Sequence, residues 1–427
     1  MLSMLSMRSL LVTCLGVACA AALAPGLAPT AAGARTGVPR TAGHSPAASE
    51  PPGSTQSLPI AADPGPTARR ALGDTSPAPG SRGLTAHPVR PFSLVGVVWD
   101  DADAELHGRI QVRTRPTGTA AWSPWQDVQP HHDDAPDLDA ADRYGTRVRG
   151  STAPLWVGES DAVQLRITPA PGRRARGDLP RGLRLELVDP GAAPPAPAAA
   201  AELPALDKAA SEEAVAKDPE RTAAHRYVGP RPRIVTRAGW GADESLRRGD
   251  HRYTDTVRAA FVHHSASGNN YTCAQAPSVI RAIYRYDVQS THWRDMGYNF
   301  LVDKCGTVYE GRAGGVTEPV LGAHTRGFNE NSMGVAVLGT FATTEPPRAA
   351  VRGVARLTAW KLGLYGADPR GTTRLTSAGG NRFEQGREAG LNVISGHRDG
   401  FHTHCPGTRL YEKLGQIRDF AAQLQGR

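Results

Sequence analysis

Two residues near the C-terminus have the side-chain types and the spacing of metal ligands. His397 and Cys405 lie eight positions apart in the Gly- and Pro-bounded loop Gly396–Gly407, directly after the apolar run Leu391–Ile394. Imidazole and thiolate are the ligands that a borderline-soft ion such as zinc prefers. A site that does chemistry also needs a third protein ligand and an open fourth position.

A third ligand is available at the end of another strand-like run. Residues Arg258–Val262 read as a short buried strand that ends in His263 and His264. Because successive strand residues point to opposite faces, only one of these histidines can face the same metal as His397 and Cys405. The spacing does not choose between them. A lone histidine at a strand end is commonly a hydrogen-bonded structural residue, and the cluster with Cys405 is what favours a ligand.

The first residues of the chain have the features of a secretory signal. Residues 1–34 contain Arg8, the apolar stretch Leu10–Leu23 and small-residue cleavage sites, so we expect a signal peptide. The apolar stretch is too short for a comfortable membrane span. Export is therefore predicted, with a lipid anchor at Cys19 as the alternative.

Export constrains the remaining cysteines. Loss of the signal peptide leaves Cys273, Cys305 and Cys405, and an odd cysteine in a secreted protein needs an explanation. The simplest arrangement is a Cys273–Cys305 disulfide, with Cys405 kept as a metal thiolate. In the alternative arrangement Cys405 pairs with one of the other two, and no metal site exists.

The charge of the chain gives weak evidence about its partners. The 427 residues carry a formal net charge of +8, which permits a polyanionic partner such as nucleic acid or an anionic cell wall. Arginines supply most of the positive charge and are spread along the chain without a dense basic block. A nucleic-acid-binding face is therefore not predicted.

Changes in composition divide the chain beyond the signal peptide into four parts. Residues 35–88 are rich in Pro, Gly, Ala, Ser and Thr and are predicted to be disordered. In residues 89–190 apolar and polar residues alternate between turns, which predicts a small all-β domain, a sandwich. Residues 191–229 are expected to be a linker. We expect the tryptophans of the β-domain in its core rather than on a sugar-binding surface; they are Trp99, Trp122, Trp125 and Trp156.

Residues 230–427 alternate predicted strands with predicted helices. The strands are expected at Val257–His264, Asn299–Lys304, Thr307–Arg312, Ser332–Phe341 and Leu391–Ser395. The helices are expected at Pro277–Val288, Pro347–Tyr365 and Arg409–Gln425. The predicted fold is therefore an α/β domain with a mixed central sheet flanked by helices, preceded by the small all-β domain.

Residues 230–427 contain seven motifs in a fixed order: Ile234–Ala242, Phe261–Ser265, Asp295–Val302, Tyr309–Arg312, Gly322–Thr325, Ser332–Val335 and the loop His397–Gly407. This is the order found in peptidoglycan recognition proteins and type-2 N-acetylmuramoyl-L-alanine amidases, and the chain resembles that family. The β-domain is similar, much more loosely, to the segment that precedes the amidase domain in exported actinobacterial members.

The resemblance implies roles for individual residues. It makes His263, His397 and Cys405 the zinc ligands, since the first residue of the family's histidine pair binds the metal. It implies that Tyr298 assists either the zinc-bound water or the reacting carbonyl, and that Thr403 lies near the scissile bond. It places three further residues in the substrate groove: His264, His324 and Asn329.

The activity implied by the resemblance is zinc-dependent hydrolysis of the amide between N-acetylmuramic acid and L-alanine. The expected partner is peptidoglycan, and we expect a secreted monomer without a membrane span. Two alternatives remain. The chain could recognise peptidoglycan without cutting it, although non-catalytic members usually replace the cysteine ligand that this chain keeps. In the other alternative, the β-domain is the functional part and the amidase domain anchors it to the wall.

Overall fold

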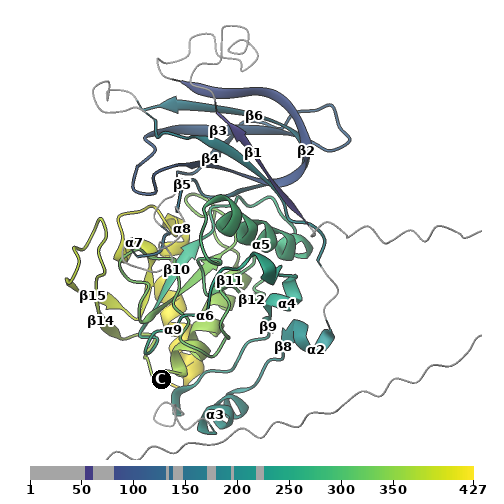
Figure 1. Cartoon of the computed structure of the whole chain (residues 1–427). Helices are drawn as coiled ribbons and strands as arrows, with labels where there is room; N and C mark the ends of the chain where they lie inside the picture. Colours follow the sequence, from purple (N-terminus) through teal and green to yellow (C-terminus); the bar gives the residue numbers. More distant parts are fainter. Residues whose placement is uncertain are drawn as a thin grey trace, which may run out of the picture. The chain divides into compact units, whose positions relative to one another are not determined.

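The computed structural model describes residues 53–60, 81–130, 134–137, 148–170, 179–193, 197–217 and 226–427. The predicted signal peptide, residues 1–34, lies outside the described residues. Residues 50–427 form one compact unit. This unit contains a β-domain with strands β1 to β7 and an α/β domain, residues 197–427 (Figure 1). Among the described helices, none is both long and apolar enough to cross a lipid bilayer.

The strands of the β-domain pair antiparallel in one sheet. Their order is β1-β7-β2-β6-β3-β4, and β5 pairs with β2. The sheet is built around an apolar core to which β2, β3, β6 and β7 contribute alternate residues. The strands are β1 (Ser54–Pro59), β2 (Arg82–Trp99), β3 (Gly108–Pro116), β4 (Gln126–Val128), β5 (Gly150–Ser151), β6 (Leu155–Pro169) and β7 (Arg184–Asp189).

One expectation for this region is corrected. β1 and the start of β2 fall within residues 35–88, which were predicted to be disordered. Both strands are held because Leu58 and Leu84 pack against the core of the β-domain, and β1 pairs with β7 over its whole length. The long, bulged strand β2 pairs with both β6 and β7, so hydrogen bonds connect the described strands of this all-β domain around its core.

The tryptophans of the β-domain divide into two pairs. Trp99 and Trp156 are buried, as expected of core residues. Trp122 and Trp125 are only half-buried, because the Arg113 guanidinium lies over both rings, 5.4 and 5.0 Å from their centroids. These two side chains therefore form a cation–π cluster at the surface of the sheet rather than part of its core.

The α/β domain has the predicted mixed sheet. Its strand order is β16-β10-β13-β11-β12-β9-β8, and β10 pairs in parallel with both β13 and β16. β11 and β12 form an antiparallel hairpin. The strands are β8 (Glu202–Leu203), β9 (Ile234–Val235), β10 (Ala259–His264), β11 (Phe300–Val302), β12 (Val308–Glu310), β13 (Ser332–Val337) and β16 (Ile394–Gly396).

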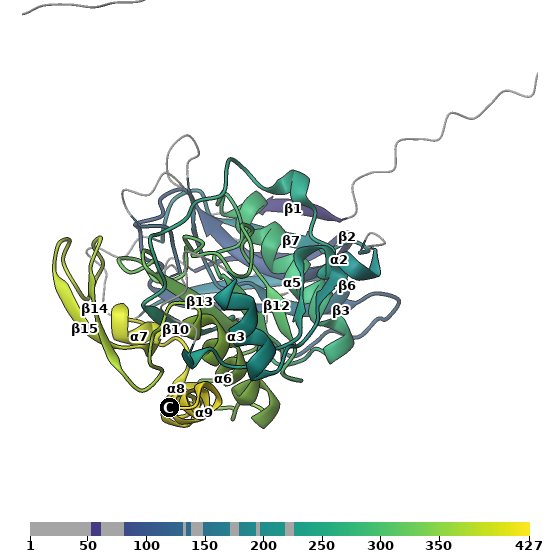
Figure 2. The ribbon, with the colours of Figure 1, turned by 90° about the horizontal axis from the view of Figure 1, so that it is seen from below.

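Helices cover both faces of this sheet (Figures 1 and 2). Even-numbered β10 residues such as Val262 pack with helices α6 (Arg348–Gly363) and α9 (Leu414–Gln425). The opposite face packs against helix α5 (Ala276–Arg285), which continues into the π turn η5 (Tyr286–Ser290). The alternation of β-strand side chains thus separates two apolar cores.

Several boundaries differ from prediction. The expected helix Arg409–Gln425 is broken into α8 (Thr408–Tyr411) and α9. The predicted strand Leu391–Ser395 is divided between β15 (Glu388–Asn392) and β16, and β15 forms a hairpin with β14 (Thr372–Thr376). The predicted linker also contains regular structure. It includes helices α2 (Ala198–Ala201) and α3 (Lys208–Ala216), and β8 extends the sheet by pairing with β9.

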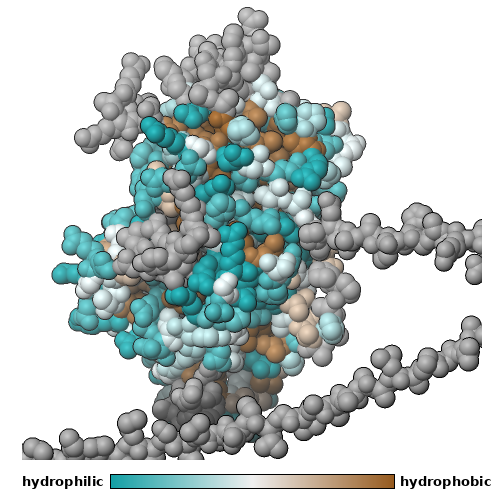
Figure 3. Space-filling view, viewed as in Figure 1, coloured by the Kyte–Doolittle hydropathy of each residue, from teal (hydrophilic) through white to brown (hydrophobic). Residues whose placement is uncertain are grey.

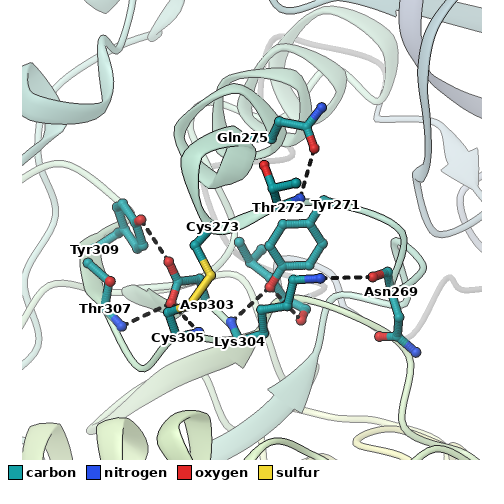
Figure 4. Close-up of a disulfide and its surroundings, with 11 residues drawn as sticks. Asn269, Tyr271, Thr272, Cys273, Gln275, Asp303, Lys304, Cys305, Thr307 and Tyr309 are labelled. Carbon is teal, nitrogen blue, oxygen red and sulfur yellow. Dashed lines mark hydrogen bonds between the residues drawn. A yellow bond between two sulfur atoms is a disulfide. The ribbon is translucent and has the colours of Figure 1, made fainter.

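The Cys273–Cys305 disulfide joins the segment before α5 to the turn between β11 and β12 (Figure 4). The carboxylate of Asp303 shapes this turn, because its Oδ1 accepts hydrogen bonds from the backbone N–H groups of Cys305 and Thr307, at 2.8 and 2.9 Å. Its Oδ2 accepts a hydrogen bond from the Tyr309 hydroxyl, at 2.9 Å. The disulfide therefore fixes the hairpin that follows Tyr298.

The β-domain and the α/β domain share an apolar core. Leu94, Val98, Trp156 and Val188 of the β-domain pack in the same cluster as α5. The buried Tyr286 hydroxyl lies 3.3 Å from the carbonyl oxygen of Val97 and 3.1 Å from that of Thr152, and can donate to both. The described surface is largely hydrophilic in the view of Figure 3. The large apolar side chains of the described residues are mostly buried.

Candidate metal centre

The side chains of His263, His397 and Cys405 come together at one edge of the mixed sheet. His263 is near the end of β10, and His397 directly follows β16. Because β10 and β16 are parallel, both strands end at the same edge. Cys405 lies in the loop after helix α7 (His397–Gly400). All three residues are fully buried, and one ligand atom from each lies within 4.8 Å of the others.

The pleat of β10 determines which of the two histidines takes part. Val262 faces the core with α6, so the ring of His264 is on that side, whereas His263 faces the other side with Phe261. Nδ1 of His264 accepts a hydrogen bond from the backbone N–H of Phe341, at 3.2 Å. The ring of His264 is buried and supports the chain at Phe341. That His264 lines a substrate groove stays a prediction.

Hydrogen bonds hold the ligands in orientation. Nε2 of His263 lies 3.3 Å from Oγ1 of Thr325, so Nδ1 is the nitrogen that faces Cys405 Sγ, 3.7 Å away. Cys405 Sγ accepts a hydrogen bond from the backbone N–H of His264, at 3.4 Å. The backbone N–H of Cys405 donates to Thr403 Oγ1, at 3.1 Å. Partners of this kind orient ligands and tune the metal that they hold.

The donor set fits a zinc ion. Imidazole nitrogen and thiolate sulfur are both regular zinc ligands, and a catalytic zinc takes three protein ligands with the fourth position left for other groups. With zinc bond lengths of about 2.0 Å to nitrogen and about 2.3 Å to sulfur, tetrahedral nitrogen and sulfur ligands lie about 3.5 Å apart. The observed 3.7 Å between His263 Nδ1 and Cys405 Sγ is close to this separation.

The Tyr298 hydroxyl points at the same site from the segment before β11. Its ring centroid lies 5.4 Å from that of His263, and its hydroxyl donates to Oδ2 of Asp134, at 2.6 Å. Burial, followed by the negative charge of Asp134, raises the pKa of Tyr298 well above its usual value. The hydroxyl is therefore protonated at neutral pH and is a hydrogen-bond donor.

His324 and Asn329 lie beneath the ligands, and both are buried. Nδ1 of His324 lies 3.0 Å from Thr325 Oγ1, and burial together with the nearby His263 lowers the pKa of His324 well below its usual value. Oδ1 of Asn329 accepts hydrogen bonds from the backbone N–H groups of His324 and Thr325, at 2.7 and 2.9 Å. A Cβ atom at Gly334 would lie 2.3 Å from the His324 ring, so glycine is needed there. These residues support His263 through Thr325.

The C-terminal loop places its other polar residues outside the ligand cluster. Thr403 is half-buried and holds the backbone of Cys405 as described above. His402 and His404 are exposed. Neither of these two histidines therefore belongs to the cluster of His263, His397 and Cys405.

The site also contains residues from the β-domain that the sequence analysis did not identify. Oδ1 of Asp134 lies 3.1 Å from Nδ1 of His263 and 3.0 Å from Nδ1 of His397. Oδ1 of Asp137 accepts hydrogen bonds from the backbone N–H of Gly327, at 2.5 Å, and from Nδ2 of Asn329, at 2.9 Å. A short segment of the β-domain thus reaches two parts of the α/β domain.

A local signal for this segment exists in the sequence. Residues 133–142 contain five aspartates, in a chain that is otherwise rich in arginine. Such a cluster predicts an exposed acidic loop as readily as a functional one. The contact of this segment with His263 depends on how the two domains pack. Local sequence patterns carry no information about that packing.

Comparisons with known protein families assign both parts of the chain. Residues 253–408 match the model of the family described as N-acetylmuramoyl-L-alanine amidase. Residues 44–205 match a family described as Rv3811 N-terminal galactose-binding domain-like. The second match includes β1 and the segment with Asp134.

Individual proteins similar to this chain carry the name of peptidoglycan recognition proteins. Peptidoglycan recognition protein 1 of Bos indicus is 30% identical over 184 residues, 43% of this chain and 83% of the relative. Peptidoglycan-recognition protein SC2 of Drosophila simulans is 29% identical over 181 residues, 42% of this chain and 84% of the relative. The solved structure of Drosophila PGRP-LB is 23% identical, with a TM-score of 0.34, covering 43% of this chain and 92% of that one.

Proposed function

Because this chain belongs to the family of peptidoglycan recognition proteins and type-2 N-acetylmuramoyl-L-alanine amidases, we propose that it is a zinc-dependent amidase. Its substrate is the amide between N-acetylmuramic acid and L-alanine in peptidoglycan. The observation that carries this proposal is the buried cluster of His263, His397 and Cys405, whose ligand atoms lie within 4.8 Å of one another. A chain that only recognised peptidoglycan would not need these three ligands together.

Each residue of the centre has a part in this chemistry. A bound zinc ion supplies a Lewis acid that polarises the scissile carbonyl and makes water more acidic. His263 and His397 bind as neutral imidazoles, and Cys405 contributes the single negative charge of the triad. The Thr325 hydroxyl keeps the His263 ring oriented, and the backbone N–H of His264 stabilises the thiolate.

Tyr298 is the hydrogen-bond donor of the site. Its raised pKa keeps the proton on the hydroxyl at neutral pH. The hydroxyl can therefore donate to the carbonyl oxygen of the scissile amide as negative charge develops there. A single preorganised donor of this kind is typically worth about 3 kcal/mol of transition-state stabilisation.

Recognition without cleavage is the competing proposal, and two observations favour it. The similar proteins reported above are named for recognition, and Asp134 lies directly against His263 and His397. The intact ligand set favours the enzyme. We further propose that the protein is secreted and acts on the cell wall as a monomer, with the predicted signal peptide directing export.

The test is the fate of the amide in purified peptidoglycan. Zinc-loaded protein is incubated with the wall, and mass spectrometry follows the release of peptides with a new N-terminal alanine. We expect release by the zinc-loaded protein and none after Cys405→Ser. If neither the wild type nor an Asp134→Ala variant cleaves the amide although both bind the wall, the amidase proposal is wrong and recognition is right.

A further inference from the structure

The segment Asp134–Asp137 of the β-domain occupies the candidate metal centre in the described structure. Both oxygens of the Asp134 carboxylate are used. Oδ1 lies 3.1 and 3.0 Å from the Nδ1 atoms of His263 and His397, and Oδ2 accepts the Tyr298 hydroxyl hydrogen bond, at 2.6 Å. The residue is 7% exposed. A carboxylate buried to this degree needs charged or hydrogen-bonding partners, and this one has them at the proposed ligands.

The position of Asp134 Oδ1 matches that of a fourth metal ligand. Carboxylate oxygen is a regular zinc ligand at about 2.0 to 2.2 Å. Oxygen and nitrogen ligands of a tetrahedral zinc then lie about 3.4 Å apart, a few tenths of an ångström more than the observed 3.0 and 3.1 Å. The ligand atoms that lie within 4.8 Å of one another belong to His263, His397 and Cys405, so these side chains would have to rearrange for the Asp134 carboxylate to join them around one ion.

A second anchor holds the same segment a few residues further along. Asn329 Nδ2 donates to the carbonyl oxygen of Ala135, at 3.0 Å, and to Oδ1 of Asp137, at 2.9 Å. The backbone N–H of Gly327 donates to the same Asp137 oxygen. These donors hold a short acidic peptide by its carbonyl and its carboxylate. A peptide substrate that used them would have to displace the segment.

Little room is left beside Tyr298 while the segment is in place. The cavity that Asp134, Tyr298 and Asp287 line measures about 30 Å³. A water molecule needs roughly 10 to 15 Å³ on this measure, so the space holds two or three waters. A muramyl peptide does not fit between the described residues in this arrangement.

We propose that Asp134–Asp137 is a built-in latch, in which the Asp134 carboxylate is the fourth ligand of the metal and peptidoglycan must displace it. The part of this inference that concerns catalysis rests on the proposed amidase function. The latch acts through charge as well as space. A thiolate and a carboxylate together neutralise a divalent ion, whereas the triad without Asp134 leaves one positive charge to polarise a carbonyl.

The domain interface indicates which part moves. The β-domain is fixed to α5 by the shared core and by the Tyr286 hydroxyl near the carbonyls of Val97 and Thr152. Displacing the whole domain would expose that core. Displacing residues 134–137 breaks polar contacts, which water can replace. We therefore expect the segment to open while the β-domain stays in place.

The first experiment measures the metal rather than the activity. Zinc affinity is determined by competition with a chromophoric chelator, and the visible absorption spectrum is recorded after cobalt(II) substitution. Asp134→Asn should weaken zinc binding by about tenfold or more and change the cobalt spectrum, because the anionic oxygen ligand is lost. Asp127→Asn is the matched control, since Asp127 is an exposed β-domain carboxylate whose partner is Arg109. Wild-type affinity and spectrum in Asp134→Asn would overturn the latch.

A second variant opens the latch without touching the metal ligands. Asp137→Ala removes the acceptor of Gly327 and Asn329 and should raise the affinity for a soluble muramyl tripeptide several-fold at unchanged zinc stoichiometry. An affinity equal to that of the wild type would contradict displacement. This variant also keeps the inference testable if Asp134→Asn fails to fold.

Activity separates the latch from the proposed function. If both proposals hold, Asp134→Ala should cleave peptidoglycan about tenfold faster than the wild type. Altered zinc affinity and cobalt spectrum with no cleavage by any variant would keep the latch and reject the amidase. Cleavage by the wild type together with an unchanged metal site in Asp134→Asn would keep the amidase and reject the latch.

Discussion

At the scale of single residues, the centre assigns different tasks to neighbouring side chains. His263 and His264 are adjacent in sequence, yet the pleat of β10 turns one to the metal centre and the other to Phe341. Cys405 lies beside the exposed His404, but only the cysteine is buried with the other ligands. Substitutions at neighbouring positions should therefore have very different effects.

Cys405→Ser should abolish stoichiometric zinc binding. Serine is not ionised at neutral pH, so the substitution removes both a strong ligand and the only negative charge of the triad. Metal content after dialysis, measured by elemental analysis, should fall from one zinc per chain towards none. His404→Ala is the control and should keep its zinc. If the Cys405→Ser protein retained one zinc per chain, the Cys405 thiolate would not be a zinc ligand.

Tyr298→Phe should slow catalysis while leaving zinc in place. The ring can still pack near His263, but the hydroxyl donor to the developing oxyanion is lost, so the turnover number should fall roughly 100-fold. The same hydroxyl also binds Asp134, so the comparison is made in an Asp134→Ala background. Equal turnover with tyrosine and phenylalanine in that background would mean that the hydroxyl serves only the latch.

At the scale of elements, the sequence predicts the parts that depend on local pattern. The strand that ends in His263 and His264 appears as predicted, because a short apolar run is a local signal. β1 was not predicted. It is an edge strand whose burial depends on β7, more than 120 residues later. Composition alone could not distinguish it from the Pro- and Ala-rich residues around it.

Removing the Cys273–Cys305 disulfide should destabilise the fold without emptying the metal site. The bridge closes a loop of 32 residues, for which the chain-entropy model gives about 4 kcal/mol. A Cys273→Ala, Cys305→Ala double variant should lose that much in urea unfolding and keep its zinc. Loss of less than about 1 kcal/mol would show that other contacts hold the hairpin.

Asp137 should make the fold more stable in mild acid than at neutral pH. Burial is the main cause that raises the pKa of Asp137 to about 6, and the nearby charge of Glu330 acts in the same direction. The hydrogen bonds from Gly327 and Asn329 lower the pKa in part. The pKa of Asp137 is higher in the folded than in the unfolded state. Its contribution to the free energy of unfolding is therefore greatest below pH 4 and is lost as the pH rises through 6.

The matched variant isolates this effect. Asp137→Asn keeps an oxygen acceptor but cannot ionise, so its free energy of unfolding relative to the wild type should increase between pH 4 and pH 7. The increase should reach up to about 3 kcal/mol, since one pKa unit corresponds to about 1.4 kcal/mol. Parallel stability curves for the two proteins in urea would contradict the raised pKa.

At the scale of the whole molecule, the two domains behave as one body around α5. Tyr286 is part of the core shared by Leu94, Val98 and Trp156. The sequence predicts each domain separately, because each has its own periodic pattern. It does not predict that the segment with Asp134 reaches His263, since this contact joins residues 129 positions apart across a domain interface.

Tyr286→Phe should weaken the whole molecule rather than one domain. The substitution removes the hydroxyl that reaches the carbonyls of Val97 and Thr152 in a buried interface, at a cost of about 1 to 2 kcal/mol. Tryptophan fluorescence and circular dichroism should report a single transition, shifted equally by both probes. Two separate transitions in the wild type would show that the domains unfold independently.

The presence of Asp134 and the metal centre in one chain also changes how a substrate competes. A tethered ligand acts at an effective concentration in the millimolar range, whatever the amount of protein. A dilute soluble fragment competes poorly with such a ligand, whereas an intact wall displays its stem peptides at high local density. If the chain is the amidase proposed above, the rate of cutting per molecule would then depend on how crowded the stem peptides are around it.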